Sequence, residues 1–311
     1  MKKNKTDDNV HKTTWKTYLR NSWQLYLMLL IPIVYMLLFR YKPMVGGIIA
    51  FKKFNVFAGM WKSPWVGLAN FKEAFGSMDF WNALKNTLIL NAGDLILGFP
   101  VPILIAVFLF EIRSYRIRKI TQTILYLPNF LSWVIIAGIV TQLFSASGLV
   151  NALISKTGLT EINFLSNPFI WRFVYWISGI WQSAGYSLII YLAALSSTDP
   201  SLGEAAYIDG ATRLQRIAHV TIPQIRPTIS IMLIMQLGKI VSIDFDRPYM
   251  MGNTLVKSAS DVISTYVYSV GLQSGRFDFA TAVGLFQSVV GIILILSVNQ
   301  ISKKMGEEGI M

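Results

Sequence analysis

The chain has 311 residues, of which 53% are apolar and only 14% are charged, and its formal net charge is +12. A soluble chain rarely combines so little charge with so much apolar content, so the composition indicates a membrane protein with one domain. The absence of cysteine excludes disulfides and thiol chemistry, and Lys and Arg beside anionic headgroups explain the positive charge without nucleic-acid binding.

Apolar blocks long enough to cross a bilayer core of roughly 30 Å follow a polar segment at residues 1–20. A cleaved signal peptide is the alternative for the first block. The long polar lead and the lack of a small-residue cleavage site favour an uncleaved span. We predict an all-α domain over 21–305, a tail at 306–311, and six spans at about 23–40, 84–110, 122–145, 169–195, 228–246 and 279–301.

The second predicted span contains an acidic residue and two prolines. Gly98-Phe-Pro-Val-Pro102 should kink this helix because proline removes a backbone donor. Asp94 should face the protein interior or water, since a carboxylate in lipid is costly. A buried packing contact and a ligand contact explain it equally well.

The third and fourth predicted spans carry polar and aromatic side chains. In the third, Pro128 and Ser132 should turn backbone or hydroxyl groups toward a central passage. In the fourth, Trp171 and Tyr175 are placed as a headgroup belt, and the deeper Trp181 and Tyr186 suggest helix packing.

The fifth predicted span holds Lys239 and ends in Asp244-Phe-Asp-Arg-Pro248. Lys239 and Asp246 are seven residues apart, hence on one helical face, and an ion pair between them would reduce the cost of burying either charge. We therefore expect this pair, with Asp244 less well aligned.

Residues 200–223 form the main amphipathic interruption of the second half. Pro200 and Ser201…Glu204 predict a helix start with a capping box, and Gly210 allows a sharp bend. A second short helix should run from Thr212 to Val220, with Pro223 and Pro227 ending it. The segment predicts a helical hairpin at the membrane surface.

The segment contains Glu204-Ala-Ala, then three residues, Gly210, nine further residues and Val220-Thr-Ile-Pro223. This pattern resembles the cytoplasmic signature loop of permease subunits of binding-protein-dependent ABC importers. Val220 and Ile222 stand where Ile and Leu are usual. Three further segments resemble the carbohydrate branch of this family, near Gram-positive polysaccharide and oligosaccharide permeases. They are Trp65-Val-Gly-Leu-Ala-Asn-Phe71, Leu127-Pro-Asn-Phe-Leu-Ser-Trp-Val134 and Thr281-Ala-Val-Gly-Leu-Phe-Gln287.

This resemblance implies the type I importer fold with a coupling hairpin at 200–223. It also implies partners: a second permease, two ATPase subunits that bind ATP and Mg, and an extracellular solute-binding lipoprotein. Both termini would be cytoplasmic, because the hairpin must reach a soluble ATPase. The residues that would contact the ATPase are Glu204, Ala205, Ala206, Asp209, Gly210 and Pro223.

We expect no enzymatic activity and no cofactor or metal on this chain. It has no G-x-x-x-x-G-K-[ST] motif, no hydrolase or metalloprotease motif, and its two histidines, His11 and His219, are far apart. The sugar path should combine aromatic faces with hydrogen-bonding groups, although packing explains the same residues nearly as well. The candidates are Trp133, Gln142, Tyr186, Asp244 and Asp246.

Two other functions fit the sequence. An ion-coupled secondary transporter or channel could use Asp94, Lys239 and Asp244 in its spans. A receptor subunit that only reports sugar binding is the second alternative. Dependence of uptake on an ATPase discriminates the importer from both.

Overall fold

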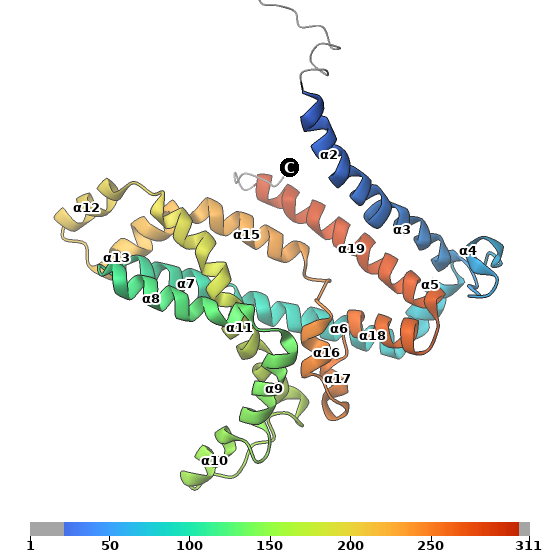
Figure 1. The fold of residues 1–311 in the computed structure, drawn as a ribbon. Coiled ribbons are helices and arrows are strands. Elements are labelled where there is room, and N and C mark those ends of the chain that lie inside the picture. The colour runs from blue at the N-terminus through green and yellow to red at the C-terminus, as the bar shows by residue number, and fades with distance from the viewer. Residues whose placement is uncertain (1–21, 305–311) are drawn as a thin grey trace, which may run out of the picture.

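The computed structural model describes residues 22–304, which form helices joined by short irregular segments (Figure 1). An isolated antiparallel bridge between Lys52 and Trp65 is the sole extended pairing in that range. The tails predicted at 1–20 and 306–311 lie outside the described residues.

The first span is a long helical rod whose first helix, α2 (Trp23–Met36), stands away from the rest of the chain in Figure 1. No side chain of its first helix is buried. The rod extends to Phe51, beyond the predicted end near residue 40, because a π turn before Pro43 lets the helix continue. Its parts are α2, η1 (Leu37–Tyr41), α3 (Lys42–Met44) and η2 (Val45–Phe51), of which η2 packs against the last helix.

The second span is one helix of 33 residues that begins at Met78, earlier than predicted. The two prolines do not break it, because a π turn opens before Pro100 and Phe99 N–H donates to the Asp94 carbonyl. The short α4 (Gly59–Lys62) and α5 (Ala69–Gly76) precede it, and its parts are α6 (Met78–Gly93), η3 (Asp94–Gly98) and α7 (Pro100–Phe110).

The third predicted span is divided into two helices. The chain is extended at Leu131, and the Ser132 hydroxyl accepts a hydrogen bond from Ile135 N–H at the start of the new helix. A single helix over 122–145 is therefore wrong. The segments are α8 (Tyr115–Tyr126), η4 (Leu127–Phe130), α9 (Trp133–Phe144) and α10 (Leu149–Lys156).

The central element is α11 (Pro168–Ser196), which packs against α7, α8, η3 and α17. Its aromatic residues are distributed opposite to the prediction. Trp171 and Tyr175 are fully buried, whereas Trp181 and Tyr186 are about half exposed. Glycine permits the close contacts, since a Cβ at Gly185 would overlap the backbone of Leu125 in α8.

The fifth predicted span is a short helix followed by irregular backbone. Helix α15 (Arg226–Gly238) stops eight residues before Asp246, and residues 239–245 are not helical. The predicted Lys239–Asp246 pair is wrong for this reason: the two residues share no helix, and neither forms an ion pair within residues 22–304. The chain continues through α16 (Asp246–Met251), η6 (Thr254–Val256), α17 (Lys257–Ser260), α18 (Ile263–Tyr268), η7 (Ser269–Gln273) and α19 (Phe277–Lys304).

Length and hydropathy select four helices of the described chain as able to cross a membrane, and a fifth if the bent pair ending at Gly238 counts as one. Helix α11 is not among them, although its 29 residues would reach about 44 Å at 1.5 Å per residue. Its Trp, Tyr, Ser and Gln side chains lower its mean hydropathy. Burial inside the bundle explains why such a span need not be uniformly apolar.

Candidate functional site

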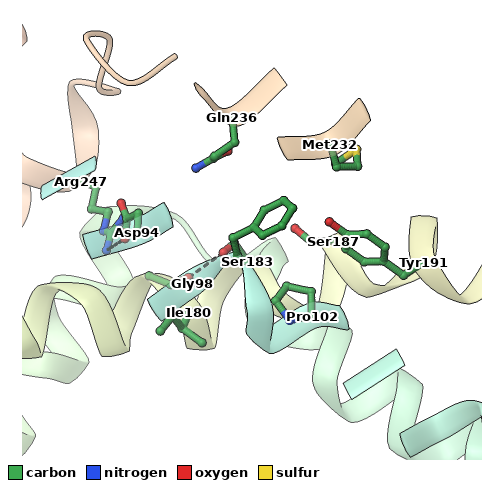
Figure 2. A pocket seen from close by; sticks show the side chains of 12 residues that line it. Asp94, Gly98, Pro102, Ile180, Ser183, Ser187, Tyr191, Met232, Gln236 and Arg247 are labelled. Atoms are coloured by element: carbon green, nitrogen blue, oxygen red, sulfur yellow. Dashed lines mark hydrogen bonds and ion pairs between the residues drawn. The ribbon is translucent and has the colours of Figure 1, made fainter. Parts of the chain in front are cut away.

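Two adjoining hollows lie among the spans, with volumes of about 210 and 360 Å³. The first, called the inner hollow because it extends toward the 200–223 end of the bundle, is lined by α7, by the second half of α11 down to Tyr191, and by α15 (Figure 2). The outer hollow is lined by Trp133, Tyr175 and the irregular segment after α15. Five residues border both hollows: Asp94, Gly179, Ser183, Gln236 and Arg247.

An ion pair between Asp94 and Arg247 lies at this shared border. Arg247 Nη1 donates to Asp94 Oδ2 at 2.8 Å, and Nη2 donates to Oδ1 at 3.1 Å and to the Tyr175 carbonyl at 2.6 Å. The guanidinium carbon lies 3.6 Å from the centre of the Tyr175 ring and 5.3 Å from that of Trp133. The carboxylate predicted to face the protein interior or water therefore has a bidentate partner within the chain.

Local sequence explains how the pair forms. The π turn of η3 begins at Asp94, and α16 begins one residue before Arg247. Gly179 leaves the space that the guanidinium occupies, because a Cβ there would overlap it. Trp171 Nε1–H donates to the Met251 carbonyl at 2.9 Å and fixes the other end of α16 to α11.

The irregular backbone of residues 239–245 is stabilised by side chains of other spans. Asn91 donates from Nδ2 to the Ile240 carbonyl at 2.7 Å, and Gln287 Nε2–H donates to the Val241 carbonyl at 2.8 Å. Non-helical backbone at membrane depth is tolerated where such partners exist or where it lines a cavity. Both conditions hold here.

The outer hollow offers several polar groups to a ligand. Lys239 and Asp244 line it, are exposed, and have no ion-pair partner in the part of the chain that the structure describes. Gln182 and Gln236 add amides, and Trp133 adds an aromatic face. Amides, charges and an aromatic ring in one concave surface are the groups that bind saccharide hydroxyls and sugar faces.

The structure brings only part of the predicted sugar path together. Trp133 and Asp244 line the outer hollow. Gln142 is near the far end of α9, Asp246 is the first residue of α16, and Tyr186 stacks on Tyr126 at 6.2 Å, and none of these three lines either hollow.

Sequence reasoning missed Arg247, Gln182 and Gln236 as cavity residues. A signal for Arg247 existed, because an isolated carboxylate in an apolar block requires a cation elsewhere in the chain. No local pattern selected Arg247 over Lys239 as that cation.

The hairpin predicted at 200–223 is present, at the end of the bundle opposite α4 and α5 (Figure 1). Helix α12 (Pro200–Ile208) is followed by Gly210 at φ 79°, then α13 (Arg213–Arg216), η5 (Ile217–Thr221) and α14 (Ile222–Gln224). All six predicted ATPase-contact residues therefore lie on one hairpin, and Tyr207, Ile208 and Leu214 expose 68%, 84% and 75% of their surface.

Two details of this hairpin differ from the prediction. The first cap is Asp199, whose carboxylate accepts from Ser201 N–H at 2.9 Å, and no Ser201–Glu204 capping box forms. That hydrogen bond lowers the pKa of Asp199 below its ordinary value. The capping box lies in the second arm instead, between Thr212 and Gln215.

Pro223 does not end the second arm. The π turn of η5 removes the need for a proline N–H, so helical structure continues to Gln224 and bends by 65° at Ile225. An ion pair joins this arm to the second span, with Arg213 Nε 3.0 Å from Glu111 Oε2.

Comparison with known proteins decides the family. The model of the family described as "Binding-protein-dependent transport system inner membrane component" matches residues 98–306. The chain belongs to this family. The predicted membership is thus confirmed, and so is the prediction that the chain is a transport component rather than an enzyme.

Two relatives align with this permease over nearly its whole length. Protein LplB of Bacillus subtilis is 41% identical over 298 residues, which is 96% of this chain and 94% of the relative. The polygalacturonan/rhamnogalacturonan transport system permease protein YteP of the same organism is 44% identical over 287 residues, 92% and 89% of the two chains.

Two solved structures are similar to this permease. One is a bacterial ABC transporter for import of the acidic polysaccharide alginate, with a TM-score of 0.86 and 43% identity over 93% of this chain and 98% of the other. The second is an alginate ABC transporter with a periplasmic protein carrying an alginate pentasaccharide, with a TM-score of 0.87, 41% identity, and coverage of 96% and 100%. The predicted all-α, multi-pass ABC importer permease fold is confirmed.

Proposed function

We propose that this permease is one of two that together form the path for an oligosaccharide in an ATP-driven importer. The observation that carries the proposal is the placement of the two functional features on shared helices. Helices α11 and α15 line both hollows, and each joins the exposed hairpin at its inner end. Movement of the hairpin would therefore reach the cavity without an intermediate element.

The relatives support a carbohydrate as the transported molecule. The relative YteP carries a name that refers to polygalacturonan and rhamnogalacturonan, and the similar structures are alginate importers. The outer hollow has the amides, charges and aromatic face that saccharide binding needs.

The remaining partners follow from the same assembly. A second, similar permease would complete the passage and two ATPase subunits would bind ATP and Mg, so this chain needs no cofactor of its own. An extracellular solute-binding lipoprotein would deliver the saccharide, as a binding protein is present in one of the similar structures. The exposed apolar surface of α2 fits lipid or a partner span.

In the proposed mechanism, ATP closes the ATPase pair and displaces the hairpin that carries Glu204 and Gly210. Helices α11 and α15 then tilt, so that the cavity closes to the cytoplasm and opens to the outside. ATP and loaded binding protein must together favour the outward state over the resting state, since a ligand shifts an equilibrium only by its differential affinity.

Reconstituted vesicles test this proposal. The permease, its sister permease, the ATPase pair and the loaded binding protein should accumulate oligosaccharide only with ATP on the ATPase side. Glu204→Lys should abolish uptake while the purified assembly keeps its composition. Normal uptake by that variant, or uptake without ATPase subunits, would overturn the proposal.

An ion-coupled transporter remains the alternative. Lys239 and Asp244 line the outer hollow and favour it in part, but Asp94 is engaged by Arg247. Vesicles holding only the two permeases, loaded with a proton or sodium gradient, discriminate the two functions. Accumulation of saccharide under these conditions would establish the alternative.

A further inference from the structure

The Asp94–Arg247 pair lies where the inner and outer hollows meet. Both residues line both hollows. Beyond them the inner hollow continues to Ser187 and Tyr191, toward the hairpin end of α11, and the outer hollow continues to Trp133 and Ser242. Figure 2 shows the pair at one end of the inner hollow, with Tyr191 and Met232 at the other.

The pair is well bonded but not fully satisfied. Three hydrogen bonds and the Tyr175 ring hold the guanidinium. However, Arg247 Nε and the Tyr175 hydroxyl are buried and have no hydrogen-bond partner within the described chain. Unsatisfied buried polar atoms in a native structure require an explanation, and a second arrangement that supplies their partners is one.

Arg247 is also connected to the hairpin. Helix α15 starts at the 65° bend after the hairpin and ends at Gly238, and only the irregular segment 239–245 separates it from α16 and Arg247. That segment is attached by side-chain hydrogen bonds from Asn91 and Gln287 rather than by a helical ladder. A shift of α15 therefore pulls on the backbone that positions Arg247.

We propose that Asp94 and Arg247 form a gate between the two hollows, closed when the pair is made and opened when displacement of the hairpin draws Arg247 away. The inference rests on the proposed transport function, because a gate requires a passage. The two residues set access between the hollows, and the energy comes from the ATPase. In the open state, the freed carboxylate and guanidinium can hydrogen-bond saccharide hydroxyls as the sugar passes.

The natural absence of cysteine provides a direct test. Ser187→Cys reports on the inner hollow and Ser242→Cys on the outer hollow. Each is made in the full importer in sealed, right-side-out membranes without ATP, and a membrane-impermeant maleimide is added outside. With the pair intact, the cysteine at 242 should react and the cysteine at 187 should not, whereas the cysteine at 187 should react in inside-out membranes.

Breaking the pair should then connect the hollows. Arg247→Met or Asp94→Asn should raise the outside labelling rate at position 187 by about tenfold or more, because removing one partner of a buried pair strongly destabilises the closed arrangement. Arg276→Met is the matched control. Arg276 forms the same two-bond fork with Glu73 but lines neither hollow, so its loss should leave labelling unchanged.

Three results would overturn the gate. These are outside labelling at position 187 with the pair intact, protection there in assembled Arg247→Met and Asp94→Asn, and an equal increase in Arg276→Met. Arg247→Lys replaces Arg247→Met if that variant does not assemble, since it keeps a cation but loses the fork. Labelling needs no transported sugar, so failed uptake would count against the proposed function and not against the gate.

Discussion

At the scale of single residues, the cavity depends on glycines, whose lack of a Cβ atom lets neighbouring side chains approach the backbone. Gly179 faces the Arg247 guanidinium, and Gly93 faces the Trp176 ring, in positions where any Cβ would overlap the neighbour. Trp176 in turn donates from Nε1 to the Leu90 carbonyl at 3.0 Å. Close approach of α6 and α11 therefore places the Asp94 carboxylate within reach of its cation.

Substitution of Gly179 should be costly for this reason. Gly179→Ala should displace Arg247, leave Asp94 without its partner, and destabilise the purified permease pair by about 2–4 kcal/mol. Gly138→Ala in α9 is the control, because no atom lies within 4 Å of the place its methyl group would take, and alanine favours a helix by about 0.5–1 kcal/mol. Thermal loss of monodispersity measures both, and equal melting temperatures would contradict the role assigned to Gly179.

At the scale of elements, the hairpin contains its own helix caps and its own turn. Asp199 caps its first helix, the Thr212–Gln215 box caps the second, and Gly210 turns the chain between them at φ 79°. The Arg216 guanidinium lies 5.1 Å from the centre of the Tyr207 ring and joins the two arms. These contacts are within the hairpin, so it can move as one unit.

Gly210→Ala should weaken coupling rather than assembly. A non-glycine residue in the left-handed region costs about 1–2 kcal/mol, a factor of about 5–30 in the population of the native turn. Saccharide-stimulated ATP hydrolysis by the assembled importer should decrease accordingly. Gly203→Ala in α12 has open space for its methyl group and should keep full stimulation, and an equal loss in both variants would argue against a requirement for the turn.

At the scale of the whole molecule, the helices extend between two ends, and each end exposes large apolar side chains. The hairpin exposes Ile208 at one end, and the connection after the first span exposes Phe57 at the other. The three buried apolar clusters lie between these ends, on α9 with α11, on α6 with α19, and on α7 with α11. Large exposed apolar side chains cover much of the remainder, as expected for surfaces that meet lipid or a second permease.

The proposed orientation gives a test with the same cysteine-free background. In sealed right-side-out membranes, Phe57→Cys should react with an impermeant maleimide, and Ile208→Cys should react only after the membrane is opened. Both side chains are highly exposed, so accessibility in the folded chain does not limit either reaction. Reaction at position 208 from outside would place the hairpin on the wrong side for an ATPase.

The sequence by itself determined the features that depend on neighbours along the chain. Apolar length set the membrane class, Glu204, Gly210 and Pro223 located the hairpin, and the resemblance of that segment to the importer signature loop pointed to a transport component. These signals are local, because helix, turn and span preferences arise within a few residues.

Only the tertiary structure decided how distant residues meet. Asp94 and Arg247 are 153 positions apart in the chain. The sequence-based prediction paired Lys239 with Asp246 instead, because it took the fifth span to be one continuous helix. That helix ends at Gly238, since Asn91 from another span supplies the hydrogen bonds that the irregular backbone needs. The free energy of such a break depends on partners elsewhere in the chain, so local preference cannot fix it.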